Sequence, residues 1–230
     1  MNRQRIRKYL TDIATLPGDA AAAWRSDGSA GVWTEVRRRT VDRACGYVRY
    51  LVLEADLEGF RRVPPPDGVV MRPFAGADWA ALGGLVSCRV APSFTAALRS
   101  GRTCLVAWRD CEAVGYIWFS PAVEECYENF RLLLPPETIY LWQLKVARSA
   151  RRQGLGGSLV SAGFELALEQ GIRRSWMITS PTNTAAQKTV ASITASRVLG
   201  SISRLKIASW MQSRYSPLHE PLPLQTYICP

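Results

Sequence analysis

The densest group of chemically useful residues in this sequence is a basic, glycine-rich turn at residues 151–157, Arg-Arg-Gln-Gly-Leu-Gly-Gly. Glycine lets the backbone adopt positive φ and approach a ligand closely. The first N–H groups of a helix have no partner inside it, and together with the helix dipole they form a site for anions. Because several donors lie in a row beside Arg151 and Arg152, the turn suits a diphosphate better than a single carboxylate.

Two other glycine motifs that bind phosphates do not fit this turn. A P-loop needs Gly-x4-Gly-Lys followed by Ser or Thr, and the turn contains no lysine. A dinucleotide fingerprint would start at Gly154 and Gly156, but Leu159 stands where its third glycine belongs. The acidic residue expected about twenty positions later is also missing, because 171–182 contains none.

A strand and a helix must hold the turn in place. Residues 138–146 are strongly apolar and predict a buried strand that ends just before it. Residues 155–170 place apolar side chains at near-helical spacing and predict a helix that starts in it. Residues 175–179 predict a second buried strand, and Asn183 is suited to cap the helix that follows. The centre of the chain therefore reads as a strand–helix–strand unit of a mixed α/β protein.

Further elements are predicted on both sides of this unit. The predicted strands are 44–53, 69–74, 102–108, 113–119 and one long or broken strand at 198–210, and the predicted helices are 1–16, 77–87 and 91–99. The two strands at 102–108 and 113–119 have the spacing of an antiparallel hairpin. Residues 120–138 are predicted to be a loop.

The clearest boundary in the chain is the segment from Val63 to Gly68, which contains three consecutive prolines and favours a stiff, extended link. We therefore expect an N-terminal extension at 1–62 that packs on the main domain. The main domain is expected at 63–215, followed by a proline-rich tail at 216–230 with four prolines.

Composition narrows the class of protein. The 230 residues are 47% apolar and 21% charged, which is typical of a globular domain. No stretch reaches the roughly 18 uncharged apolar residues of a membrane helix, and the basic N-terminus lacks the apolar block of a secretory signal, so a cytoplasmic location is expected. The six cysteines form no CxxC pair and His219 is the single histidine, so no metal site is predicted.

The net charge of +10 is unevenly distributed, because no acidic residue lies between Glu169 and Glu220. A positive surface attracts anions. The partners that fit are a phosphorylated cofactor, an acidic acceptor, an acidic carrier protein or nucleic acid, and the alternative is a solvated basic face. No recognition helix or stacking motif supports the nucleic acid.

With these residues in view, the chain resembles the GNAT superfamily of N-acyltransferases. Its cofactor signature, Arg/Gln-x-x-Gly-x-Gly/Ala, is matched by residues 151–156. The resemblance is strongest over 139–193, looser over 69–210, and absent from 1–62. It implies a central mixed β-sheet that is splayed between its two central strands and flanked by helices, here with an N-terminal extension.

The resemblance also implies acetyl-CoA or another acyl-CoA as co-substrate. The pantetheine would pair with the strand backbone around Lys145, at Leu144 and Val146, and the Leu144 N–H would hold the thioester oxygen. Asn183, which could equally be a plain helix cap, and Ala186 would contact the pantetheine from the other side. The residues implied around the pyrophosphate are Arg151, Arg152, Gln153, Gly154, Leu155, Gly156, Gly157 and Ser158.

The residues that would move protons depart from the family pattern. A position that often holds a tyrosine is Val190, and a frequent glutamate position is Trp142; neither side chain can transfer a proton. Possible substitutes lie in the preceding loop, and a base acting through water is an equal alternative. These substitutes, which could also be solvated loop residues, are Glu124, Glu125, Tyr127 and Glu128.

Three functions follow from the resemblance. The first is an N-acetyltransferase in which a primary amine of a small molecule, peptide or protein attacks acetyl-CoA directly in a ternary complex. The second is transfer of a longer acyl group from acyl-CoA or from an acidic acyl carrier protein, and the third is a non-catalytic CoA-binding module. Four tryptophans on successive predicted strands could line an aromatic pocket, although sheet core is the simpler interpretation; a homodimer is left open.

Overall fold

The computed structural model describes residues 21, 23–25, 28–34, 45–76, 82, 85–86, 91–120, 124–127, 130–132, 134–207, 210–218 and 224–226. Within these residues an eight-stranded sheet has the order β10-β9-β1-β8-β7-β4-β3-β2, and three short strands form a second sheet in the order β11-β6-β5. None of the helices in this part of the chain is long and apolar enough to cross a membrane.

The strands of the large sheet are β1 (Cys45–Asp56), β2 (Val69–Pro73), β3 (Thr103–Arg109), β4 (Glu112–Ser120), β7 (Thr138–Val146), β8 (Arg174–Thr179), β9 (Ser196–Ile207) and β10 (Trp210–Pro217). The small sheet contains β5 (Glu124–Tyr127), β6 (Phe130–Leu132) and β11 (Leu224–Thr226). The helices with complete bounds are α5 (Ala91–Arg99), the 3₁₀ turn η1 (Arg148–Ala150), α6 (Leu155–Glu169) and α7 (Thr184–Ala191). Residues 28–34 are also helical.

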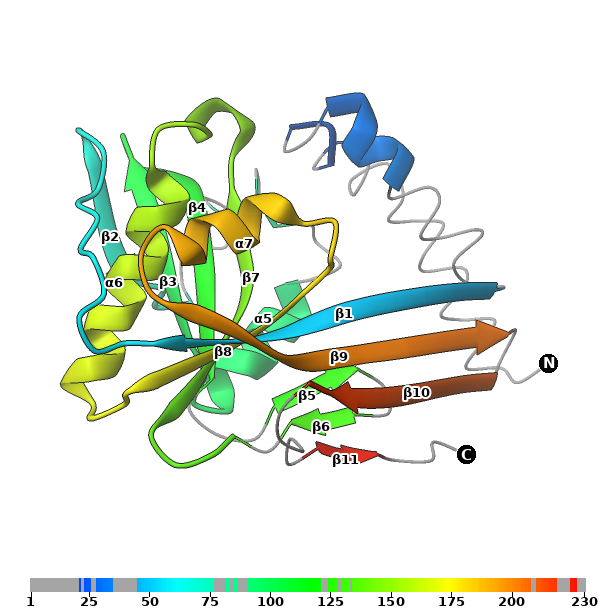
Figure 1. Cartoon of the computed structure of the whole chain (residues 1–230). Helices are drawn as coiled ribbons and strands as arrows, with labels where there is room; N and C mark the ends of the chain where they lie inside the picture. Colours follow the sequence, from blue (N-terminus) through cyan, green and yellow to red (C-terminus); the bar gives the residue numbers. More distant parts are fainter. Residues whose placement is uncertain are drawn as a thin grey trace.

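Helices cover both faces of the large sheet. Helices α6 and α7 lie on one face and α5 lies behind the other (Figure 1). The core under α6 includes the buried side chains of Leu155, Leu159 and Phe164, and the core on the α5 side includes Phe94 and Trp118. This is the mixed α/β architecture that the sequence predicts.

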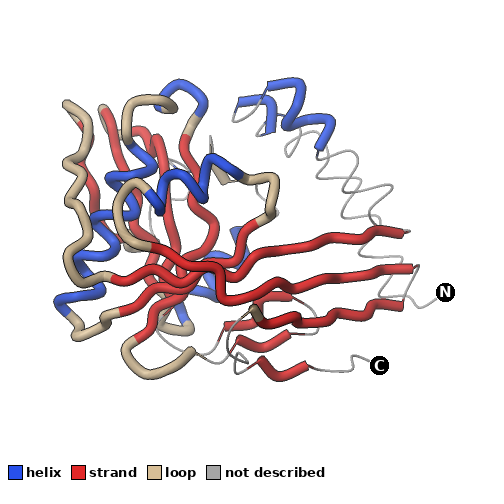
Figure 2. Tube along the Cα trace, viewed as in Figure 1, coloured by secondary structure: helices blue, strands red, loops and turns tan. Residues whose placement is uncertain are grey.

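The two central strands diverge, as expected. Strands β7 and β8 are the parallel pair of the sheet, and their pairing runs from Thr138 opposite Arg174 to Leu141 opposite Met177. Beyond that point β7 continues to Val146 without a partner on β8. The divergence opens the sheet beside the glycine-rich turn (Figure 2).

Strand β1 lies inside the large sheet, between β9 and β8, although it comes first in the described strand order. The sequence did not predict this position. The strand pairs antiparallel with β8 on one side, from Leu51 to Asp56, and with β9 on the other, from Cys45 to Ala55. The link that follows then runs along α6, where Ser161 Oγ accepts from the N–H of Val63 at 3.0 Å. The segment 45–63 is therefore integrated into the fold, and the boundary at residue 62 stays a prediction.

Close approach of α6 to β4 depends on one glycine. A Cβ built at Gly163 would lie 1.8 Å from Cζ of Phe119 on β4. No side chain fits that space, so only glycine lets the helix pack directly on this ring. The contact therefore lets α6 lie close to β4 at this point.

The end of the chain differs from the sequence prediction. The long or broken strand expected at 198–210 corresponds mainly to β9, and a second strand, β10, starts at Trp210 and pairs antiparallel with it from Ile207 opposite Trp210 to Gly200 opposite Pro217. The expected loop at 120–138 contains β5 and β6, and β11 from the tail pairs with β6. An unbroken apolar stretch in the sequence does not show where the chain reverses direction between β9 and β10. The predicted helices at 1–16 and 77–87 lie outside the described residues, apart from isolated positions in the second.

Candidate active site

The glycine-rich turn connects β7 to α6 through η1. Two residues in it adopt left-handed backbone conformations, Arg152 with φ +62° and Gly154 with φ +81°. Gly154 is the N-cap of α6, and no side chain caps the helix. The first backbone bond of the helix runs from Ser158 N to Gly154 O at 3.0 Å, which leaves the N–H groups of the first turn without helical acceptors.

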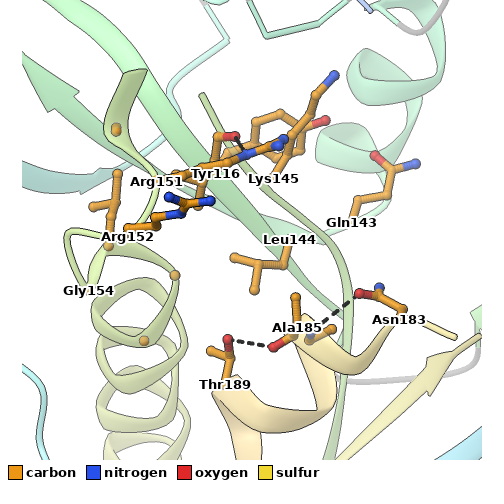
Figure 3. Close-up of a pocket in the computed structure, with 16 residues that line it drawn as sticks. Tyr116, Gln143, Leu144, Lys145, Arg151, Arg152, Gly154, Asn183, Ala185 and Thr189 are labelled. Atoms are coloured by element: carbon orange, nitrogen blue, oxygen red, sulfur yellow. Dashed lines mark hydrogen bonds between the residues drawn. The ribbon is translucent and has the colours of Figure 1, made fainter. Parts of the chain in front are cut away.

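A cleft of about 830 Å³ lies at this helix N-terminus, between β7, α6 and α7 (Figure 3). Its lining residues are Tyr116, Gln143, Leu144, Lys145, Val146, Ala150, Arg151, Arg152, Gly154, Leu155, Gly156, Gly157, Asn183, Ala185, Ala186 and Thr189. Leu144 points into it from the strand, opposite the first turns of the two helices. Most of the residues implied by the sequence are thus brought together.

The charge of the cleft suits an anion. Its lining includes Lys145, Arg151 and Arg152, and none of the described residues that line it is acidic. Arg151 is held over the end of β7, because its Nε donates to Val146 O at 3.2 Å. Lys145 reaches the opposite way and donates from Nζ to Leu85 O at 2.8 Å. Backbone donors, side-chain charge and the absence of carboxylates in the described lining all favour a phosphorylated ligand.

Two residues of the predicted set do not line the cleft. Ser158 is buried, and its hydroxyl donates to Pro64 O at 2.7 Å, away from the opening. The side chain of Gln153 lies across the outside of the turn, where Oε1 accepts from Arg109 at 2.7 Å and Nε2 donates to Ser149 O at 3.1 Å. Both therefore support the shape of the turn in this structure.

A bulge in β7 places the Leu144 backbone beside the cleft. Trp118 pairs with Trp142 and Tyr116 pairs with Lys145, so β7 has one more residue than β4 between these pairs. Gln143 takes up the extra length with φ +49°, a conformation that is strained for a residue other than glycine. Neither Gln143 nor Leu144 has a partner in the β4–β7 register, and both residues line the cleft.

Comparison with known proteins decides the family. Residues 77–191, half of the chain, match the model of the acetyltransferase (GNAT) family. This chain belongs to the GNAT family. Membership supports acyl transfer in general and acetyl-CoA as the donor that the family uses, and it confirms the resemblance seen in the sequence. No curated protein shows a significant match.

Solved structures show the same fold at low identity. A Drosophila protein of a structural genomics programme aligns with a TM-score of 0.55 at 16% identity, covering 80% of this chain and 68% of its own. The glucosamine N-acetyltransferase region of a fungal multi-domain GH3 β-N-acetylglucosaminidase aligns with 0.50 at 12%, covering 77% and 23%. At these identities the likeness concerns the fold alone.

The wall of the GNAT cleft opposite β7 is the start of α7. Asn183 is its N-cap, and Oδ1 accepts from the N–H of Ala186 at 3.3 Å. The capping role is therefore present, and the residue also lines the cleft. Ala185 in the first turn and Thr189 one turn further on also line the cleft, and neither was identified from the sequence. Their spacing of four residues on one helix face was the signal that could have found them.

Tyr116 is the second cleft residue that the sequence did not identify. It lies on β4 opposite Lys145, is 5% exposed, and packs edge-on against Phe94 with ring centroids 5.4 Å apart. Burial raises its pKa, and the neighbouring Cys104 thiol acts in the same direction, so the phenol stays protonated. It can donate a hydrogen bond and cannot act as a base. Its one signal in the sequence was that Tyr116 and Trp118 are two residues apart on a predicted strand and so face the same side of the sheet.

The two family positions for proton transfer are held by Val190 and Trp142, whose side chains cannot transfer a proton. Val190 is buried. Trp142 stacks on Trp118 with centroids 5.1 Å apart, and its Nε1 donates to Ser120 Oγ at 2.9 Å, so it acts as a packing residue. The proposed substitutes Glu124, Glu125 and Tyr127 belong to β5, but their side chains, like all of Glu128, lie outside the described residues. Their roles stay predictions.

Proposed function

We propose that this GNAT protein is an N-acyltransferase that moves an acetyl group, or another acyl group, from acyl-CoA to a primary amine. The acceptor amine belongs to a small molecule, a peptide or a protein. The observation that carries the proposal is the contact between two features: the uncapped N-terminus of α6 and the bulge at Gln143 and Leu144, which share one basic cleft.

The residues present fit coenzyme A. The N–H groups of Leu155, Gly156 and Gly157 precede the first bond of α6, and together with Arg151 and Arg152 they would hold the diphosphate. Gly156 faces Leu144, Val146 and Thr189, where a Cβ would lie 3.9–4.0 Å from their side chains, so glycine keeps the passage between β7 and α7 open. The pantetheine would follow β7 through this passage.

The proposed reaction is direct attack in a ternary complex. The amine nitrogen bonds to the thioester carbonyl carbon, the carbon–sulfur bond breaks, the amine loses a proton and the departing thiolate gains one. Charge that develops on the carbonyl oxygen is stabilised by a donor already in place, for which the backbone N–H of Leu144 at the bulge is our candidate. The amine gives its proton to water or to a residue of β5.

The test combines binding and turnover. Calorimetry should show that CoA binds the wild type, and that Gly156→Glu abolishes binding because a carboxylate enters the diphosphate site. Gln170→Glu is the matched control: it adds the same charge at the other end of α6, about 21 Å away along the helix, beyond the screening length of about 10 Å. Equal loss in both variants, or unchanged affinity in Gly156→Glu, contradicts the assignment.

A non-catalytic CoA-binding module is the second candidate. The observation in its favour is that no carboxylate lines the described cleft, so no general base is visible there. An amine panel with acetyl-CoA separates the two: release of free CoA with an acylated product identifies the enzyme, and tight CoA binding without any product identifies the module.

A further inference from the structure

A second hollow lies at the start of β8, where β8, β1 and β9 are neighbours in the large sheet (Figure 1). Its volume is about 320 Å³, at the lower end of the range of roughly 300–1,000 Å³ that is typical of sites for small molecules. It is lined by Glu54, Asp56, Arg174, Ala195, Ser196 and Arg197. Among the described residues none lines both this hollow and the large cleft, which lies past the other end of β8, about 16 Å along the strand.

The strand register places the four charged side chains of the hollow on one face of the sheet. Glu54 lies opposite Trp176 on β8 and opposite Arg197 on β9. Asp56, two residues further along β1, lies opposite Arg174 at the start of β8. Because side chains two residues apart on a strand point to the same face, these two rows of charge lie next to each other.

The first row contains a pair of opposite charges that is already satisfied. Glu54 is 8% exposed, and its Oε1 accepts from Nε and Nη2 of Arg197 at 2.9 Å and 2.8 Å. Its Oε2 accepts from Nε1 of Trp176 at 2.8 Å. The pair carries no net charge, and because its carboxylate is buried and held from both sides, it forms a fixed wall of the hollow.

The second row contains a pair of opposite charges that is not satisfied. Asp56 and Arg174 lie directly across from each other, where opposite charges normally attract, yet no ion pair joins these two described residues. One oxygen of Asp56 accepts from the N–H of Glu58 at 2.8 Å, and Arg174 donates one long bond of 3.5 Å to Pro136 O. In the described part of the chain, the other Asp56 oxygen and most Arg174 donors therefore have no partner.

We propose that this hollow binds a zwitterionic α-amino acid with a small, uncharged side chain. The carboxylate of the ligand pairs with the guanidinium of Arg174, whose planar fork suits a carboxylate, and the ammonium of the ligand pairs with the free oxygen of Asp56. The two carboxylates and two guanidinium groups of the lining sum to zero charge, so a ligand without net charge leaves the site neutral. An amine held here is about 16 Å from the end of β8, so this ligand is distinct from the acceptor of the proposed reaction.

The test titrates the ¹⁵N-labelled full chain with alanine and with serine and follows the indole N–H of Trp176 by NMR. This N–H donates to the wall carboxylate, so it reports on the hollow directly, and Trp176→Phe identifies its signal among those of the eight tryptophans. We expect a saturable shift with a Kd on the order of 1 mM, because two charge-assisted contacts at a partly exposed site give modest affinity. N-acetylalanine, which lacks the ammonium, and alanine amide, which lacks the carboxylate, should each bind about tenfold more weakly.

Two charge-neutralising variants test the contacts. Asp56→Asn and Arg174→Gln should each weaken alanine binding by about tenfold. Both side chains are exposed, and an asparagine oxygen can still accept from the N–H of Glu58, so both variants should keep the Tm of the wild type. Arg173→Gln is the matched control, because it removes the same charge one residue away, from a side chain that pairs with Glu58 and does not line the hollow.

Each other outcome overturns the proposal. It is wrong if neither amino acid shifts the Trp176 signal at about 50 mM, well above the expected Kd, or if either analogue binds as tightly as alanine. Unchanged binding in Asp56→Asn or in Arg174→Gln places the amino acid elsewhere, and equal weakening in Arg173→Gln shows that general charge is responsible. The experiment uses neither CoA nor turnover, so its result is independent of the proposed acyl transfer.

Discussion

Replacing Gly156 by alanine should move stability and CoA affinity in opposite directions. A Cβ at this position would meet Thr189 and Val146 at 3.9 Å and Leu144 at 4.0 Å, which are ordinary contacts. Without a clash, the change removes the conformational freedom of a helical glycine and should stabilise the protein by up to about 1 kcal/mol. In a chain of 230 residues this raises Tm by about 2–4 °C.

Affinity should fall because the added methyl stands in the passage between β7 and α7. Forcing a methyl into a fitted contact typically costs about 1–3 kcal/mol, which corresponds to a CoA affinity about 5- to 150-fold weaker. Calorimetric titration of CoA measures the affinity, and scanning calorimetry of the free protein measures Tm. The two readouts together distinguish loss of the site from loss of the fold.

Gly157→Ala is the matched control. Its Cβ would face Val63 and Ile193 at 3.6–3.9 Å, away from the β7 side of the passage, so it should gain similar stability and keep most of the affinity. The reasoning is refuted if Gly156→Ala binds CoA as tightly as the wild type, or if Gly157→Ala loses more affinity than Gly156→Ala does.

Three further changes test the fold around the site. Gly163→Ala should cost about 1–3 kcal/mol because its Cβ meets the Phe119 ring at 1.8 Å, and Phe119→Leu should recover part of this loss in a double-mutant cycle measured by urea unfolding. Burial raises the pKa of the Cys104 thiol from 9.0 to about 12, so the contribution of the neutral thiol to stability is complete below pH 9 and disappears as the pH rises toward 12. Cys104→Ala should therefore flatten the decline of Tm between pH 9 and pH 12. An unchanged slope of Tm against pH would contradict the assignment. Deleting residues 1–62 removes β1 from between β8 and β9 and should yield insoluble protein; a soluble product with intact CoA affinity would show that the segment is dispensable.

Local elements near the site were predictable because their signals are short-range. The strand at 138–146 coincides with β7, and the helix at 155–170 differs from α6 by one residue at its end. Glycines that open a helix after an apolar strand favour a tight turn, so the turn itself followed from spacing, and its role as an anion site stays a prediction. Asn183 was likewise found as a cap from its residue type and position.

The bulge at Gln143 had no sequence signal. Glutamine is not a residue that favours positive φ, and the conformation arises because β7 must stay paired with β4 on both sides of one extra residue. The splay beyond Leu141 has the same origin, since it depends on where pairing with β8 stops. Both features are properties of a pair of strands, and a single strand does not encode them.

The sequence by itself predicted the chemistry at one end of the site: a glycine turn that opens a helix beside two arginines and is suited to an anion. Residues within a few positions of one another set these features through backbone conformation and charge, so they need no tertiary information. Only the tertiary structure decided the rest of the candidate site and the strand order around it. Burial of Tyr116, insertion of β1 between β8 and β9, and the bulge at Gln143 result from contacts between residues far apart in the chain. Which strands pair, and where they part, is settled by packing the whole sheet against its helices.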